Sequence, residues 1–166
     1  MNYQRTTNEA QFSKFIFMLR RSKGSKFFSA DEELRIENAI ENAELKTSGE
    51  IRVFIESTCK TKVHIRTIEI FKLLKMHNTA DRNGVLLYIA MSDRQFAVFG
   101  DAGIHKHLGF GFWEKQAKYL RDFFEQNEKV EGIVNVINNI GENMAVYFPD
   151  AGTNSNELPN SIAYGK

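Results

Sequence analysis

The stretch GVLLYIAMSDRQFAVFG, residues 84–100, decides the fold of this 166-residue chain. Its first seven residues form a continuous apolar run, which is typical of a central strand that is covered on both faces. A polar turn at residues 92–94 follows, and residues 95–99 then run back as the second arm of a β-hairpin. The stretch therefore predicts a buried strand with an antiparallel neighbour that ends at Gly100.

The segments before this hairpin predict a parallel partner strand and two helices. Residues 50–56, EIRVFIE, alternate and are rich in β-branched side chains, which indicates a strand. Residues 63–76 are apolar and lack helix breakers, so we interpret them as the helix that connects the two strands, although the first half of this segment could also extend as a strand. A strand–helix–strand unit of this kind has a right-handed crossover and parallel strands. Further upstream, Ser29 and Glu32 form a capping box that opens a helix reaching about Leu45.

Two more helices are expected after the hairpin, at about residues 112–126 and 130–147. We expect the second to be broken at Gly141 and to end at Pro149. Helices before and after the strands can cover both faces of a sheet. The predicted fold class is therefore α/β, a three-layer α/β/α sandwich on a small mixed β-sheet.

The chain divides into three parts by composition. Residues 1–27 are predicted to form a basic helical segment, residues 28–149 the α/β/α domain, and residues 150–166 a polar, disordered tail. Residues 1–28 carry six basic side chains and one acidic one, a charge of +5, and the remainder carries 16 basic and 20 acidic residues, or −4. A basic amphipathic helix would suit a membrane surface. We favour instead a helix that packs on the domain with its basic end in water.

Composition limits the classes of function. The chain is 42% hydrophobic and 26% charged, as is usual for a globular domain, and its net charge of +1 gives no general attraction to nucleic acid. The single cysteine, Cys59, excludes an internal disulfide and fits a reducing compartment. No apolar stretch approaches the ~20 residues that a membrane helix needs, so we expect a cytoplasmic protein.

Acidic side chains gather where this topology places the ends of strands. Glu50 begins the first strand, Asp81 precedes the second, and Asp101 follows the third, which runs backwards; all three are therefore expected at one edge of the sheet. Carboxylates that share an edge repel each other unless a cation lies among them. Carboxylate and carbonyl oxygens suit Ca²⁺, with Mg²⁺ as the alternative. The predicted metal ligands are Asp81, Asp101, Glu50 and Asn83, the last through its amide oxygen.

The same residues also have purely structural interpretations, which the sequence leaves open. Asp101 is a suitable N-cap for a short helix that begins at Ala102. Asp81 is typical of a turn, and Glu50 could pair with a lysine. Zinc is not favoured, because His105 and His107 lie two residues apart and would face different sides of a helix. His64 and His77 lie in other predicted elements.

Three segments of the sequence resemble the TPM domain family. They are TSGEIRVFI (47–55), DRNGVLLYIAMSDRQFAVFGDAGI (81–104) and FWEKQAKYLRDFF (112–124), and the likeness extends over about residues 28–149. The family includes thylakoid-lumen proteins linked to photosystem II repair and many bacterial relatives. The sequence shows neither the signal peptide nor the C-terminal membrane anchor of the secreted and lumenal members, so we expect a soluble bacterial relative.

The resemblance implies an α/β/α sandwich and a divalent-cation site, usually described as calcium, formed by acidic residues in the loops around the sheet. Asp81 and Asp101, with Glu50 nearby, match the acidic positions of the motifs. Phosphatase activity has been attributed to some members. Two functions are therefore expected: a calcium-binding domain with a structural or protein-interaction role, and a metal-assisted acid phosphatase. We favour the binding role because no nucleophile or general base stands out beside the acidic edge; the sequence identifies no protein partner.

Overall fold

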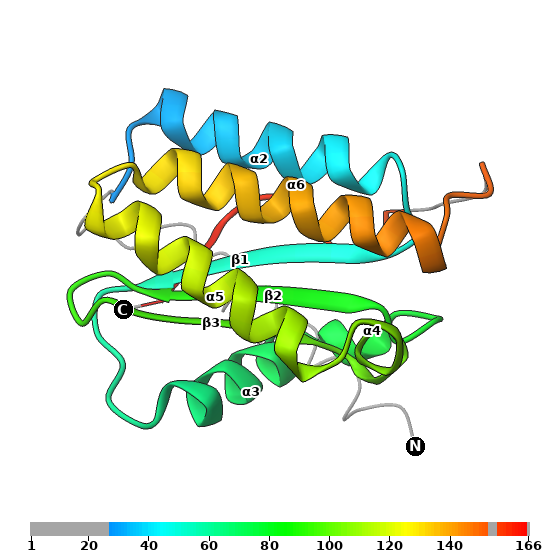
Figure 1. Cartoon of the computed structure of the whole chain (residues 1–166), viewed down its shortest axis with the longest axis horizontal. Coiled ribbons are helices and arrows are strands. Elements are labelled where there is room, and N and C mark those ends of the chain that lie inside the picture. Colours follow the sequence, from blue (N-terminus) through cyan, green and yellow to red (C-terminus); the bar gives the residue numbers. More distant parts are fainter. Residues whose placement is uncertain (1–26, 153–155, 166) are drawn as a thin grey trace, which may run out of the picture.

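The computed structural model describes residues 27–152 and 156–165. The basic helix predicted at the N-terminus lies outside these residues, except for Phe27. Along the chain the elements are α2 (Ala30–Glu44), β1 (Glu50–Glu56), α3 (Val63–Leu73), the 3-10 turn η1 (Met76–Asn78), β2 (Gly84–Ala90), β3 (Gln95–Gly100), α4 (Ala102–Leu108), α5 (Phe110–Glu125), α6 (Lys129–Tyr147) and β4 (Ala163–Tyr164) (Figure 1).

The four strands form one mixed sheet in the order β3-β2-β1-β4. β1 and β2 are parallel and β2 and β3 are antiparallel, as the sequence predicts. The bounds of β1 and β2 are those expected from the sequence, and each strand is buried along its whole length. The fourth strand was not predicted; it pairs with β1 in parallel.

Helices cover both faces of this sheet, which confirms the three-layer α/β/α sandwich. α2, α5 and α6 lie on one face and α3 on the other (Figure 1). Alternate residues of β1 enter the two cores: Val53 belongs to the larger core under α2, α5 and α6, and Phe54 to the smaller core against α3. The two faces are therefore both apolar, which explains the continuous apolar run of the central strand.

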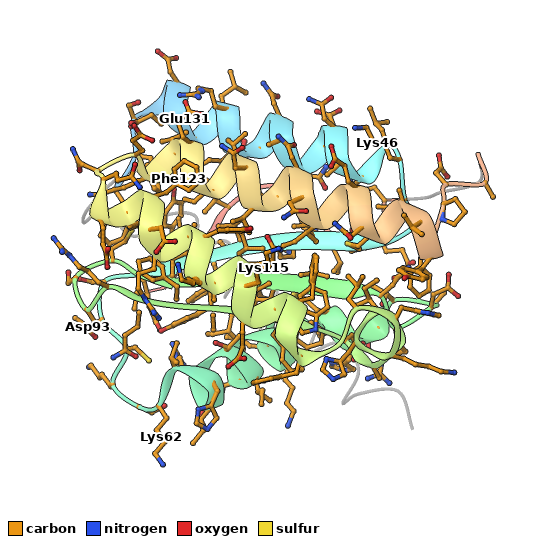
Figure 2. All side chains as sticks on the ribbon, viewed as in Figure 1. Lys46, Lys62, Asp93, Lys115, Phe123 and Glu131 are labelled. Carbon is orange, nitrogen blue, oxygen red and sulfur yellow. The ribbon has the colours of Figure 1, made fainter. Side chains whose placement is uncertain are left out.

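The helix α6 is not broken at Gly141, contrary to the prediction. It runs unbroken from Lys129 to Tyr147, and a Cβ atom on Gly141 would lie 2.6 Å from the Cβ atom of Ala43 in α2. The glycine therefore permits two helices to approach closely. Gly132 has the same role, because a Cβ atom there would lie 2.5 Å from the Cβ atom of Phe123 in α5. Figure 2 labels Phe123 on α5, which packs against α6.

Residues 156–165 are ordered, although the sequence predicts disorder for residues 150–166. Residues 156–165 pack beside the sheet, and the amide of Gly165 donates to the carbonyl oxygen of Ile55 at 2.8 Å. The Tyr164 hydroxyl donates to Glu33 of α2 at 2.7 Å, and the Ile162 amide donates to Glu37 at 3.2 Å. The disorder predicted for residues 150–166 is therefore wrong for this part of the tail. Within the described ranges, no helix is long and apolar enough to span a membrane.

Candidate functional site

The sheet brings the predicted acidic residues to one edge. In the register, Glu50 is opposite Gly84 on the parallel strand, and Val85 is opposite Gly100 on the antiparallel strand. The start of β1, the start of β2 and the end of β3 therefore coincide, as the topology predicts. The side chains at this edge do not share one environment, however, and each is described in turn.

Asp101 caps α4 and also forms a two-point ion pair. Its backbone is extended, and its Oδ1 atom accepts a hydrogen bond from the Ala102 amide at 2.8 Å. The Arg82 guanidinium donates through Nε to Oδ2 at 2.5 Å and through Nη2 to Oδ1 at 2.7 Å. The carboxylate raises the pKa of Arg82, through the hydrogen bonds first and its charge second. The cap interpretation of Asp101 is thus confirmed, and Arg82 supplies the counter-charge that sequence reasoning assigned to a cation.

The loop that carries Arg82 is held against the first turn of α4. Arg82 has a left-handed backbone with φ of 52°, and its carbonyl oxygen accepts from the amides of Gly103 at 2.8 Å and Ile104 at 3.3 Å. A Cβ atom on Gly103 would lie 2.1 Å from the carbonyl oxygen of Asp81, so only glycine allows this approach. The Asp81 side chain itself is exposed at the edge of the loop.

Asn83 is buried beside this loop, and only the nitrogen of its side-chain amide has a hydrogen-bond partner among the described residues. Its Nδ2 atom donates to Ser48 Oγ at 3.3 Å, and its backbone amide donates to Thr79 Oγ1 at 3.2 Å. Its Oδ1 atom is buried and accepts no hydrogen bond from any residue that the structure describes. A buried acceptor without a partner costs about 1–3 kcal/mol, so this oxygen is open to a donor or a cation.

Glu50 is covered by the ordered tail. Its carboxylate accepts from the backbone amides of Glu157 at 2.9 Å and Leu158 at 3.2 Å, and the residue is only 1% exposed. Burial raises the pKa of Glu50, while those two amides act in the opposite direction. The tail therefore satisfies the oxygens that were predicted to bind a metal.

A second buried carboxyl lies next to it and was missed by sequence reasoning. Glu44 ends α2, and its Oε1 atom accepts from the Ile51 amide at 2.8 Å. Burial raises the pKa of Glu44 to about 8, and the negative charge of Glu50 adds to the shift. Its place at the end of a helix, next to a loop, gave no sign that the strand would bury it.

The four predicted ligands thus occupy three environments. Asp101 is paired with Arg82, Glu50 is bound by the tail, and Asp81 and the Asn83 oxygen have no hydrogen bond or ion pair within the described chain. No group of three or more His, Cys, Asp and Glu side chains that could hold a metal occurs in residues 27–152 and 156–165. In this arrangement the four predicted ligands do not form a preformed cation site, and cation binding by them stays a prediction.

Comparisons with known proteins agree with the fold. The profile of the TPM domain matches residues 22–143. The chain is similar to the BA42 protein of the psychrophilic bacterium Bizionia argentinensis, with 40% identity and a TM-score of 0.80 over 87% of this chain and 99% of that one. It also shares its fold with the N-terminal domain of a P. gingivalis protein, with 14% identity and a TM-score of 0.58 over 74% of this chain and 80% of that one. No curated protein sequence matches significantly.

Proposed function

Because the chain belongs to the TPM domain family, we propose that it is a divalent-cation-binding domain, with calcium as the favoured ion, whose role is structural or in protein interaction. The ion would bind at the loop before β2 and the start of α4. The proposed ligands are the carboxylates of Asp101 and Asp81, with the Asn83 oxygen as a further candidate. Glu50 would not take part while the tail covers it.

One observation carries this proposal: the ion pair of Asp101 is buried on the side of the carboxylate and exposed on the side of Arg82. The Asp101 side chain is 5% exposed, whereas that of Arg82 is 51% exposed. A buried carboxylate requires a positive partner, but an arginine whose stem is in water can leave at little cost in packing. A calcium ion with Asp101 and Asp81 as ligands would satisfy the same carboxylate. Calcium and Arg82 would therefore compete for Asp101.

A metal-assisted phosphatase is less well supported by this geometry. Phosphoryl transfer needs positive groups that are free to contact the phosphate. Arg82 directs its Nε and Nη2 donors at Asp101, and the carboxylate of Asp101 occupies the start of α4. These groups would repel or compete with a phosphate, so the binding role is the better account of the site.

Calcium titration of three proteins tests the competition. We would follow the wild type, Asp101→Asn and Arg82→Gln by calorimetry and by backbone amide NMR, with Asp31→Asn on the exposed start of α2 as the matched control. Arg82→Gln should bind calcium more tightly than the wild type, and Asp101→Asn should lose binding. The proposal is wrong if Arg82→Gln shows no calcium response at residues 79–83 and 101–104. Hydrolysis of p-nitrophenyl phosphate that requires Asp101 would favour the phosphatase instead.

A further inference from the structure

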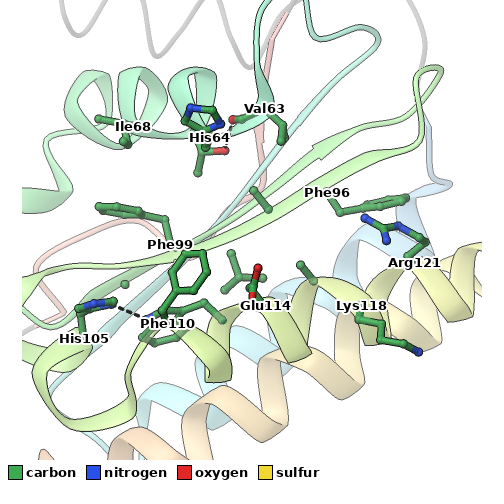
Figure 3. A pocket seen from close by; sticks show the side chains of 16 residues that line it. Val63, His64, Ile68, Phe96, Phe99, His105, Phe110, Glu114, Lys118 and Arg121 are labelled. Atoms are coloured by element: carbon green, nitrogen blue, oxygen red, sulfur yellow. Dashed lines mark hydrogen bonds between the residues drawn. The ribbon is translucent and has the colours of Figure 1, made fainter.

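A groove of about 460 Å³ runs along the outer edge of β3, on the far side of that strand from β2. Its volume is in the range of binding pockets. Figure 3 shows its construction: His64 and Ile68 of α3 form one wall, Lys118 and Arg121 of α5 form the other, and Phe99 of β3 lies between them. The groove is separate from the acidic loop before β2.

The floor of the groove is a row of backbone groups that no residue in the described ranges pairs with. The amide of Asp101 donates to the carbonyl oxygen of Gly84 at 2.9 Å, so the pair 101–84 is hydrogen-bonded across the antiparallel ladder. In such a ladder the residues whose backbone groups face the partner strand alternate. Backbone donors and acceptors of Phe96, Val98 and Gly100 therefore point away from β2, toward the groove. An edge of this kind is a template for another strand.

The walls supply apolar contacts for alternate side chains. Trp113 of α5 lies against the end of β3, where a Cβ atom on Gly100 would come within 2.2 Å of its ring. Its indole Nε1 donates to His105 Nδ1 at 3.0 Å, which fixes the ring at one end of the groove. Phe110, which is 67% exposed, and Ile68, which is 36% exposed, add large apolar surfaces that have no cover within the described chain.

Basic side chains outnumber acidic ones in the lining of the groove. Lys118 and Arg121 line it, against the single acidic side chain of Glu114. Lys118 is paired with Asp122 at 2.7 Å, whereas Arg121 is exposed and makes no ion pair with a described residue. A ligand that carries a carboxylate would therefore be favoured at the Arg121 end.

We propose that this groove binds an extended, acidic segment of a partner protein, which adds to the free edge of β3 as a further strand. Strand addition draws affinity from main-chain hydrogen bonds and specificity from pockets for alternate side chains. A second copy of this chain fits less well, because its own β3 edge is recessed between α3 and α5. The basic residues 1–28, with a charge of +5, do not match the charge of the groove.

A designed peptide tests strand addition directly. The probe is the acetylated, amidated peptide DVTVTVD, and the readout is the amide NMR spectrum of the full chain. Binding should move the amide signals of Phe96, Val98 and Gly100, and methylation of alternate peptide nitrogens should weaken it about tenfold or more, because each lost hydrogen bond is not replaced. The charge-reversed peptide KVTVTVK should bind more weakly. Absence of any shift at millimolar DVTVTVD, or equal binding of the methylated peptide, would overturn the proposal.

Two variants locate the site on the protein. Val98→Pro removes an outward N–H and leaves the ladder to β2, a position where an edge strand tolerates proline; it should abolish peptide binding. Arg121→Glu should weaken binding of DVTVTVD and strengthen binding of KVTVTVK. Lys115→Glu, on α5 but outside the groove, should change the binding of neither peptide. If Val98→Pro fails to fold, the methylated peptide and Arg121→Glu still test whether the peptide adds to the edge of β3. A dimer by sedimentation that Arg121→Glu dissociates, without peptide binding, would assign the edge to a second copy and refute the proposal.

Discussion

Replacing Glu44 by glutamine should remove most of a pH dependence that is built into this fold. The carboxyl is buried at the end of α2, and burial raises its pKa to about 8. Glutamine has the same size and retains an Oε1 atom that can accept from the Ile51 amide, as Glu44 does at 2.8 Å. The substitution therefore removes the ionisation and keeps the hydrogen bond.

The sign and size of the effect follow from proton linkage. In the unfolded chain the carboxyl ionises near pH 4.5, whereas in the folded protein it holds its proton until about pH 8. The contribution of Glu44 to the free energy of unfolding is fully present below pH 4.5. It is lost as the pH rises toward 8, and the free energy of unfolding falls by about 1.4 kcal/mol per pH unit. The upper limit over this window is about 5 kcal/mol. Glu50, whose pKa is also raised by burial, acts in the same direction.

Urea unfolding of the wild type and Glu44→Gln at pH 5 and pH 8.5 measures the difference. From pH 5 to pH 8.5 the free energy of unfolding of the variant should rise by several kcal/mol relative to that of the wild type. The variant's own free energy of unfolding should also vary less with pH. Glu41→Gln, an exposed glutamate on the same helix, should follow the wild type at both pH values. Parallel pH curves for Glu44→Gln and the wild type would show that Glu44 is already ionised in the folded protein at neutral pH.

Three further substitutions test contacts of the site and the tail. Asp101→Ala should be less stable than Asp101→Asn by about 0.5–2 kcal/mol in urea unfolding, because both lose the charge that pairs with Arg82 and only alanine also loses the cap. Gly103→Ala should cost about 1–3 kcal/mol by the same measurement, since its methyl group would meet the Asp81 carbonyl; an unchanged midpoint would contradict this packing. Tyr164→Phe should cost about 1 kcal/mol through the lost hydrogen bond to Glu33, and an unchanged free energy of unfolding in this variant would show that the bond does not anchor the tail.

The sheet was predictable from the sequence because its signal is local. Residues 84–90 are apolar without interruption and residues 50–56 are β-branched, and both patterns arise from burial of the strands themselves. The common edge of Glu50 and Asp101 then followed from the crossover rule and the antiparallel hairpin. These inferences needed only the order of the elements.

Side-chain partners at that edge were not predictable in the same way. The pairing of Arg82 with Asp101 depends on a left-handed backbone at Arg82, which no hydrophobic pattern reports. The tail appeared disordered because its composition is polar, yet it is held by main-chain hydrogen bonds and by a few side chains such as Ile162. A glycine inside a helical pattern, such as Gly141, predicts a break, but a close contact between two helices selects glycine just as a kink does.

The tail contacts also indicate an order of events in folding. The bond from Tyr164 to Glu33 joins residues 131 apart, and that from Glu157 to Glu50 joins residues 107 apart. Loops of this length close slowly and at an entropic cost, whereas the β2–β3 hairpin closes over a few residues. The last strand should therefore dock onto a sheet that has already formed, and it should also detach first. Each detachment would expose Glu50 to water and leave its two amide partners open to hydrogen exchange. The exchange rates of the Glu157 and Leu158 amides would therefore report how often the tail opens while the rest of the domain stays folded.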